Sequence, residues 1–273
     1  MNGKNNSGLD ERSLGLRRMI VKTLGSAGRG HLGPAFSIVE IITVLYDKVM
    51  KFKPGAPEWN GRDRFILSKG HGCAALYVML ADKGFFSCSE LERFCKYDGL
   101  LGGHPEFNIP GVEASTGSLG HGLSIGIGMA LNARLRRMDY NVYVLLGDGE
   151  CGEGSIWEGA MSASKHGLEN LVAIVDYNKS QAYGSTSEVL DLEPFADKWR
   201  GFGFGVVEVD GHDVGGLLSA FKNAPARKGK PTAVICHTVK GKGAPFTENN
   251  MEWHHKNKIS DQDIDLLLKA LEA

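Results

Sequence analysis

The stretch Val142–Gly152, VYVLLGDGECG, decides the fold of this 273-residue chain. Its first five residues form a continuous apolar run, which is typical of a strand buried on both faces. A glycine-rich turn follows, and the apolar spacing beyond it predicts a helix over 155–166. Strand, turn and helix in this order form the unit from which parallel sheets are built.

The same alternation continues on both sides of this stretch. The runs without polar alternation are expected to be strands covered by helices on both faces. We therefore predict one α/β domain over 1–273, with a doubly wound, mostly parallel sheet and a long functional loop over 99–122. Strands are predicted over 64–67, 142–146, 171–175, 204–209 and 232–236, and helices over 10–27, 37–50, 73–83, 123–138, 155–166 and 214–223, with a last helix capped by Ser260 and Asp263.

The composition excludes several classes of protein. Lys and Arg total 31 and Asp and Glu total 32, so the chain lacks the basic surplus expected of a protein that binds nucleic acid or an anionic membrane. Its longest wholly apolar run, 73–81, is far shorter than the ~18–20 residues of a membrane span. The polar segment 1–9 has no signal-peptide core. Five cysteines without CxxC spacing favour a reduced, cytoplasmic protein.

The turn after the strand over 142–146 has the spacing G-x-G-x-x-G of a dinucleotide site, but its charge argues against one. Asp148, Glu150 and Glu153 would repel a diphosphate unless a cation lay between them. Mg²⁺ fits, because it binds one or two protein oxygens together with phosphate oxygens. Asn178 follows the next strand at the same edge of the sheet and could be a second oxygen ligand. An acidic helix start with a turn asparagine is the plain alternative.

Gly147, Asp148 and Gly149, with Asn178 thirty positions after the aspartate (178 − 148 = 30), resemble the thiamine diphosphate motif of transketolases and their relatives. The resemblance implies that Asp148, Asn178 and the backbone carbonyl of Ser180 hold Mg²⁺, with Ca²⁺ or Mn²⁺ as alternatives. It also places Gly147 and Gly149 beside the cofactor. The fold implied is the diphosphate-binding domain of the thiamine diphosphate enzymes.

Four histidines extend the resemblance. His31, His71 and His104 lie in short glycine-rich motifs similar to those that line the thiazolium and substrate channel in transketolases. Imidazoles can donate hydrogen bonds to sugar hydroxyls and move protons near neutral pH. The resemblance assigns a diphosphate contact to His254, with His255 as the alternative register. We expect catalytic roles for His31, His71, His104 and His254, and cofactor contacts for His71 and His254.

Three further cofactor contacts follow from the resemblance. Gly117 would let the backbone approach the aminopyrimidine, and Leu119 would press on the ring system. Ser118 and His121 stand where the family commonly has proline and glutamine, so their roles stay open. Glu153 matches a family acid that helps to build the subunit interface near the cofactor, although an ordinary helix start explains it equally well.

The resemblance covers nearly the whole chain, but the family's pyrimidine-binding and C-terminal domains have no counterpart in it. The glutamate that activates the cofactor belongs to that pyrimidine-binding domain. We therefore expect the N-terminal subunit of a split transketolase, in an α₂β₂ assembly with a C-terminal subunit that supplies the missing domains. The implied reaction transfers a two-carbon ketol unit from a ketose to an aldose. The sequence does not decide whether the ketose donor is a pentose phosphate, a branched sugar or a sulfonated sugar.

Two other functions compete with this interpretation. One is the cofactor-binding subunit of another thiamine enzyme, such as a 2-oxoacid or acetoin dehydrogenase or a deoxyxylulose-phosphate synthase relative. The segments 68–71 (SKGH) and 102–106 (GGHPE) disfavour the dehydrogenases, and the missing domains disfavour the synthase. The other is a non-catalytic Mg²⁺–nucleotide-binding subunit, which would have no use for three channel histidines.

Overall fold

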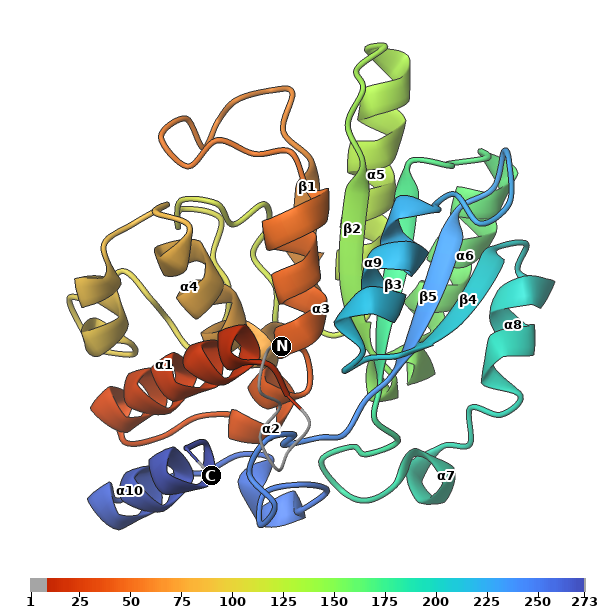
Figure 1. The fold of residues 1–273 in the computed structure, drawn as a ribbon. Helices are drawn as coiled ribbons and strands as arrows, with labels where there is room; N and C mark the ends of the chain where they lie inside the picture. The colour runs from red at the N-terminus through yellow and green to blue at the C-terminus, as the bar shows by residue number, and fades with distance from the viewer. Residues whose placement is uncertain (1–8, 273) are drawn as a thin grey trace.

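The computed structural model describes residues 9–272, so nearly all of the polar N-terminal segment lies outside the described residues. Five strands form one sheet in the order β1-β2-β3-β5-β4, and every pairing is parallel (Figure 1). Parallel strands need long crossover connections, which helices supply here. The doubly wound α/β fold is therefore confirmed, and the predicted "mostly parallel" sheet is entirely parallel. The strands are β1 Arg64–Leu67, β2 Val142–Gly147, β3 Leu171–Tyr177, β4 Gly205–Asp210 and β5 Thr232–His237.

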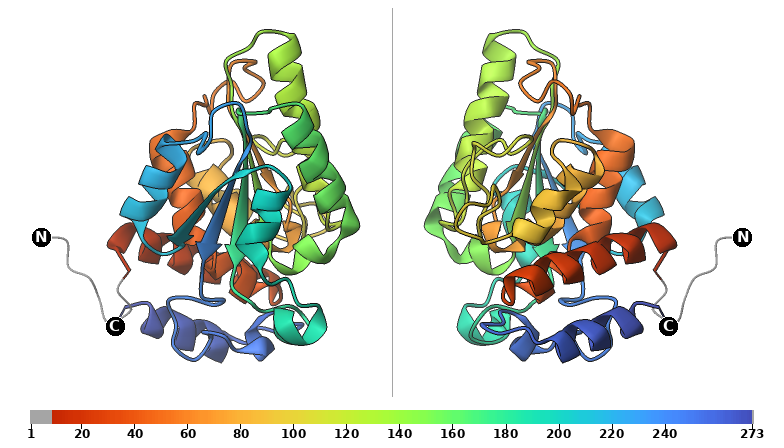
Figure 2. Two further views of the ribbon diagram at one scale, coloured as in Figure 1. Left: turned by 90° about the vertical axis from the view of Figure 1, so that its right-hand side faces the viewer. Right: turned by 90° about the vertical axis from the view of Figure 1, so that its left-hand side faces the viewer.

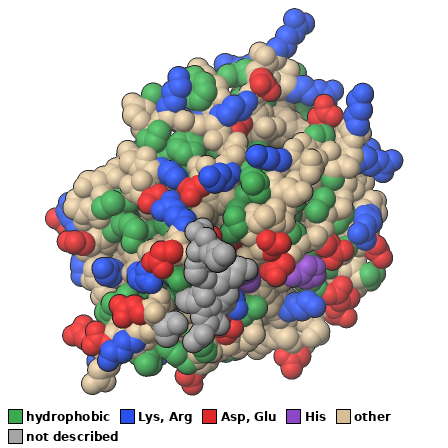
Figure 3. All heavy atoms as spheres, viewed as in Figure 1, with side chains coloured by type: hydrophobic (Ala, Val, Ile, Leu, Met, Phe, Trp, Pro, Cys, Tyr) green, Lys and Arg blue, Asp and Glu red, His purple; other side chains and the backbone are tan. Residues whose placement is uncertain are grey.

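Helices cover both faces of the sheet, α5 and α6 on one and α3 and α9 on the other (Figure 2). Acidic and basic side chains are interspersed over the face of the molecule that Figure 3 shows. Among the described residues, no helix combines the length and the apolar character needed to cross a membrane. The helices are α1 Glu11–Ala27, α2 Leu32–Phe36, α3 Val39–Val44, α4 Cys73–Asp82, α5 Gly122–Leu135, α6 Gly154–Lys165, α7 Thr186–Val189, α8 Phe195–Gly201, α9 Val214–Lys222 and α10 Asp261–Ala270.

The central strands supply two hydrophobic cores. Val142, Val144 and Leu146 pack with α5, α6 and α8, whereas Tyr143 and Leu145 pack with α1, α3, α4 and α9. Successive side chains of a strand point to opposite faces, so an unbroken apolar run feeds both cores. This is the physical reason why the run over 142–146 predicted a buried parallel strand.

Three local expectations were wrong. The helix expected over 37–50 is divided into α2, α3 and a π-helical turn over Leu45–Val49. It begins earlier because Pro34 lies in the first turn of α2, where a missing N–H costs little. β4 is partly exposed, because it pairs only with β5 at the edge of the sheet. The short helices α7 and α8 were not expected, although Ser185 and Glu188 form a capping box at the start of α7.

The carboxyl ends of the parallel strands position the functional residues. The segments after β1, β2, β3 and β5 meet at one end of the sheet, the lower end in Figure 1. Open α/β sheets bind their ligands in the crevice at this end. The residues singled out after the strands at 142–146 and 171–175 are therefore neighbours in the fold.

Candidate active site

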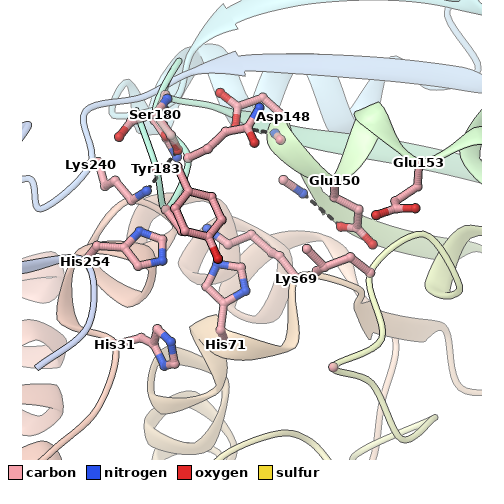
Figure 4. Close-up of a pocket in the computed structure, with 17 residues that line it drawn as sticks. His31, Lys69, His71, Asp148, Glu150, Glu153, Ser180, Tyr183, Lys240 and His254 are labelled. Atoms are coloured by element: carbon pink, nitrogen blue, oxygen red, sulfur yellow. Dashed lines mark hydrogen bonds between the residues drawn. The ribbon is translucent and has the colours of Figure 1, made fainter. Parts of the chain in front are cut away.

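A cavity of about 360 Å³ lies at the carboxyl end of the sheet (Figure 4). All of the predicted site residues except His104 line it, and they come from six separate segments of the chain. His104 lies beside it and lines an adjoining cavity. The predicted residues that line the larger cavity are His31, His71, Gly117, Leu119, Gly147, Asp148, Gly149, Glu153, Asn178, Ser180 and His254.

Asp148 is buried at the turn that follows β2. One carboxylate oxygen accepts a hydrogen bond from the Gly149 N–H at 2.7 Å, and the other accepts one from the Lys179 N–H. Burial, together with the nearby carboxylate of Asp176, raises the pKa of Asp148 to about 7. No side-chain cation pairs with Asp148 among the described residues. A bound cation would favour the ionised form of this carboxyl group.

Asn178 follows β3, and both polar atoms of its side-chain amide form hydrogen bonds. Its Nδ2 donates to the Asp176 carboxylate at 3.1 Å, and its Oδ1 accepts from the Ser180 N–H at 3.1 Å. Burial would raise the pKa of Asp176, but the positive charge of Lys69, followed by hydrogen bonds to the carboxylate, lowers that pKa below its ordinary value. Besides Asn178, the donors to this carboxylate are the Lys69 ammonium and the hydroxyls of Ser37 and Thr238.

The carbonyl oxygen of Ser180 faces a cation. The Nζ of Lys240, which follows β5, donates to this oxygen at 2.9 Å (Figure 4). Burial, together with the positive charge of Lys69, lowers the pKa of Lys240 to about 8. The atom expected to bind a divalent ion is thus oriented toward a positive charge within the cavity. Among the described residues, no group of three or more His, Cys, Asp or Glu side chains is arranged to hold a metal.

Histidine rings form the wall opposite the carboxylates. The ring centroid of His31 lies 5.4 Å from that of His71, 5.8 Å from that of His254 and 6.4 Å from that of His104. Burial, followed by the charges of neighbouring histidines and lysines, lowers the pKa of His31 to about 4. Burial also lowers the pKa of His71 well below its ordinary value. His31 and His71 are therefore neutral at pH 7, and each can donate one hydrogen bond and accept another.

His254 and His255 separate into different cavities. His254 shares its cavity with Asp148, whereas His255 lies 4.4 Å from His31 by ring centroids and lines the adjoining cavity. Burial and the charge of Lys240 lower the pKa of His254 to about 3. The Nδ1 atom of His254 is buried without a hydrogen-bond partner among the described residues. Such an atom is costly unless a ligand satisfies it.

The loop after residue 115 closes one side of the cavity. Gly117 has a φ of 141°, and a Cβ there would lie 3.0 Å from the His104 ring, so only glycine fits. Leu119 is 36% exposed and lines the cavity. The Gly120 N–H donates to the Glu150 carboxylate at 2.8 Å. Glu150 also accepts from Ser68 and from the Gly147 N–H, so it ties this loop to the turns after β1 and β2.

Sequence reasoning missed several residues of the cavity wall. Lys69 follows β1 and Lys240 follows β5. Asn178 was predicted as a site residue because it follows a buried strand, and the same argument applies to these two lysines. The sequence analysis noted Glu150 only for its charge, although its carboxylate accepts hydrogen bonds that join the surrounding turns. Tyr183 also lines the cavity (Figure 4), and no pattern in the sequence marks it.

Comparisons with known proteins agree with this geometry. A family model described as "Transketolase, thiamine diphosphate binding domain" matches residues 11–272. The chain belongs to the transketolase family. Transketolases transfer two-carbon ketol units with the help of thiamine diphosphate, and this chain is the part of such an enzyme that binds the cofactor.

Two relatives match this transketolase chain over most of their own length. One is a subunit of the apulose-4-phosphate transketolase from Phocaeicola vulgatus, which is 42% identical over 90% of this chain and 88% of the relative. The other is a 6-deoxy-6-sulfo-D-fructose transketolase subunit from Clostridium sp. strain MSTE9, which is 42% identical over 88% of each chain.

Solved transketolases have the same fold but are longer. The Campylobacter jejuni enzyme superposes with a TM-score of 0.90 at 29% identity, covering 96% of this chain and 42% of the other. Pichia stipitis transketolase in complex with sedoheptulose 7-phosphate gives a TM-score of 0.90 at 31% identity, with 96% and 40% covered. This chain therefore spans about two fifths of these longer transketolases.

Proposed function

We propose that this chain is the thiamine diphosphate-binding subunit of a two-chain transketolase, in which Asp148, Asn178 and the Ser180 carbonyl hold Mg²⁺ against the cofactor's diphosphate. The observation that carries the proposal is the placement of Asp148. It is a buried carboxylate that pairs with no side-chain cation within residues 9–272, and it shares one cavity wall with two further oxygen donors. Oxygen donors are the ligands that Mg²⁺ prefers, and Ca²⁺ or Mn²⁺ could replace it.

The opposite wall fits a diphosphate. The unpartnered Nδ1 of His254 can donate a hydrogen bond to a phosphate oxygen, and the Lys240 ammonium adds positive charge. The glycines of the turn, Gly147 and Gly149, leave room for a ligand beside the backbone. We propose that the rings of the cofactor contact Gly117 and Leu119, on the other side of the cavity.

The histidines act on the sugar. When bound, thiamine diphosphate supplies the nucleophilic carbon that carries the two-carbon unit. His31, His71 and His104 then bind the hydroxyl and carbonyl oxygens of the sugar, and a neutral imidazole can pass a proton to or from one of these oxygens. The low pKa of His31 keeps its ring in the form that can both donate and accept.

A partner chain completes the enzyme. Relatives of similar length are named as subunits, and single-chain transketolases are more than twice as long as the part that this chain matches. We propose that a C-terminal subunit supplies the pyrimidine-binding domain with its glutamate, in an α₂β₂ assembly. We also propose a cytoplasmic location, because all five cysteines are free thiols.

The donor is proposed to be a ketose with an anionic end. The two relatives named above are assigned by name to apulose 4-phosphate and to 6-deoxy-6-sulfo-D-fructose, one a phosphate and the other a sulfonate. A sugar phosphate or a sulfonated sugar is therefore the substrate class that we infer for this chain.

The test is the isosteric variant Asp148→Asn in the assembled two-chain enzyme. Calorimetric titration with thiamine diphosphate, with and without Mg²⁺, measures the contribution of the metal to cofactor affinity. We expect the wild type to bind far more tightly with Mg²⁺ and Asp148→Asn to lose that difference. The matched control is Asp197→Asn, an exposed aspartate of α8. Equal Mg²⁺ dependence in all three proteins would refute the metal assignment.

A further inference from the structure

Three side chains form a buried polar network that the function proposed above does not use. They are Arg17 from α1, Glu40 from α3 and His212 from the turn between β4 and α9. None of the three lines the cavity that contains Asp148. Arg17 and Glu40 are almost completely inaccessible, and the His212 side chain is 10% exposed. Burying charged groups costs free energy unless their partners are well placed, so the partners of this network indicate what it does.

Glu40 holds the other two side chains of the network. Its carboxylate accepts hydrogen bonds from the Arg17 guanidinium, including one of 3.0 Å from Nη2, and its Oε2 atom lies 2.8 Å from Nδ1 of His212. Burial would raise the pKa of Glu40, but the charge of Arg17, followed by the hydrogen bond with His212, lowers it to about 2. Glu40 is therefore ionised at pH 7, and it orients both partners.

The backbone of Val239 determines the tautomer of His212. The Nε2 atom of His212 lies 2.9 Å from the backbone nitrogen of Val239. Because a backbone N–H can only donate, Nε2 is the acceptor and carries no proton. The proton of the neutral ring then lies on Nδ1, which donates it to the Glu40 carboxylate. His212 thus joins a buried carboxylate to the segment that follows β5.

Arg17 bonds to the same segment at a second point. Its Nε donates to the carbonyl oxygen of Lys242 at 2.7 Å. Gly243 has a φ of 112°, and a Cβ there would lie 2.8 Å from Cδ of Arg17, so only glycine fits. The network therefore bonds to the backbone at Val239 and at Lys242, on either side of Lys240.

The sheet places His212 beside this segment. β4 and β5 pair in parallel, with Asp210 opposite His237 at their carboxyl ends. The Gly211 N–H donates to the His237 carbonyl at 2.8 Å. A Cβ at Gly211 would clash with Cγ2 of Thr238, so the turn that carries His212 packs directly against the segment after β5.

Lys240 connects this segment to the cavity. Of residues 239–242, Lys240 alone lines the cavity, where its Nζ donates to the Ser180 carbonyl at 2.9 Å. A lysine side chain is a flexible four-carbon stem, so the position of its backbone limits where the ammonium group can lie. Fixing the backbone on both sides of Lys240 therefore restricts its ammonium group to one region of the cavity wall.

We propose that the buried network fixes the backbone of residues 239–242 and thereby holds the Lys240 ammonium on the diphosphate side of the cavity, with His212 as a positioning residue. The proposal rests on the proposed binding of thiamine diphosphate and deepens it. His212 does not touch the cofactor but acts on it through Lys240.

Two variants separate the two hydrogen bonds of His212. A glutamine amide reaches the position of Nε2 and can accept from the Val239 N–H, whereas an asparagine amide reaches only the position of Nδ1 and can donate to Glu40. Calorimetric titration of the assembled two-chain enzyme with thiamine diphosphate at saturating Mg²⁺ measures the effect. We expect His212→Asn to weaken binding about 10-fold, because the Val239 N–H loses its acceptor, and His212→Gln to restore most of that loss.

A double-mutant cycle with Lys240→Met tests whether His212 acts through Lys240. Lys240→Met should weaken binding by itself, because the wall loses a positive charge. Adding His212→Asn to it should change the affinity little further, since the group that His212 positions is gone. Additive losses in the double variant would overturn the proposal.

His237→Asn is the matched control. His237 ends β5 directly before the segment, and its exposed ring contacts Glu208 rather than the cavity. If a general loosening of this end of the sheet were the cause, His237→Asn and His212→Asn would weaken binding equally. That result, or wild-type affinity in His212→Asn, would refute the positioning role. So would equal losses of affinity and of unfolding free energy in His212→Asn and His212→Gln, because the network would then serve stability alone.

The two proposals fail in different ways. If the wild type binds no thiamine diphosphate, the proposed function fails, and hydrogen exchange tests the positioning directly. By mass spectrometry, the peptide that contains Val239 should then exchange faster in His212→Asn than in the wild type and in His212→Gln, and equal exchange in all three would reject the positioning too. If the wild type binds the cofactor and His212→Asn binds it equally tightly, the positioning fails and the function stands.

Discussion

The Asp176 carboxylate accepts a hydrogen bond from the side-chain amide of Asn178 at 3.1 Å. This contact fixes the orientation of the amide, so that Oδ1 points away from Asp176. Asp176 is fully buried and accepts three more hydrogen bonds, from the segments that follow α2, β1 and β5. One carboxylate therefore positions four segments at the edge of the sheet that carries the site.

We predict that Asp176→Asn weakens the binding of Mg²⁺ and also lowers the free energy of unfolding, because it leaves the buried Lys69 ammonium without its carboxylate partner. The new amide offers only one acceptor oxygen, so Asn178 would lose its fixed orientation. Loss of a partner that orients a metal ligand typically costs about 10- to 100-fold in metal affinity. The Mg²⁺ concentration that half-saturates thiamine diphosphate binding, measured by calorimetry on the assembled enzyme, should rise by this factor.

Thr238→Val is the control for Asp176→Asn. It removes one hydrogen bond to the same carboxylate but leaves the contact with Asn178 intact. Half-saturation by Mg²⁺ should stay close to the wild-type value in this variant. If Thr238→Val and Asp176→Asn shift half-saturation equally, Asp176 contributes only to stability.

His31→Ala and His104→Ala should each bind cofactor normally but transfer ketol units slowly. Both rings lie beside the proposed sugar path, at 6.4 Å between centroids, and neither belongs to the proposed metal set. Loss of a group that moves a proton typically costs about 10²- to 10⁴-fold in rate. Single-turnover kinetics with a ketose phosphate measures the effect. His166→Ala, on the exposed end of α6, should retain wild-type turnover, and full activity in both test variants would contradict the assignment.

The buried ion pair of Arg17 and Glu40 predicts a large change in stability. Both side chains are almost completely inaccessible, and Glu40 also contacts the Nδ1 atom of His212 at 2.8 Å. Arg17→Met would leave a buried carboxylate short of its main partner, which typically costs about 3–5 kcal/mol. Urea denaturation measures the free energy of unfolding. The double variant Arg17→Met/Glu40→Gln should recover part of the loss, whereas equal losses in the single and double variants would show that the charge of Glu40 is irrelevant.

Stability should fall as the pH falls below neutrality, partly through His31 and His254. Their pKa values are about 4 and about 3 in the folded chain, against about 6.5 in an unfolded one. Between pH 6.5 and 4 the unfolded chain therefore binds more protons, so the free energy of unfolding decreases with decreasing pH. Urea denaturation from pH 8 to pH 5 should show a shallower decrease in His31→Gln/His254→Gln than in the wild type. A slope identical to that of the wild type would mean that these rings titrate normally.

Much of the fold could be predicted because its determinants are local. Each apolar run that became a central strand lacks polar alternation, and the capping box of Ser260 and Asp263 starts α10 as expected. The exposed face of β4 could not be predicted, since an edge position depends on which strands pair. The division of the helix expected over 37–50 likewise depends on how α2 and α3 pack.

The sequence alone determined the parallel α/β fold and the meeting of Asp148 with Asn178, because parallel strands bring their carboxyl ends to one edge. Only the tertiary structure decided that Lys240 faces the Ser180 carbonyl, that His254 and His255 enter different cavities, and that Gly30 pairs with Lys256. These pairs come from loops and turns far apart in the chain. Their contacts depend on how the helices pack around the sheet, and no local periodicity encodes that packing.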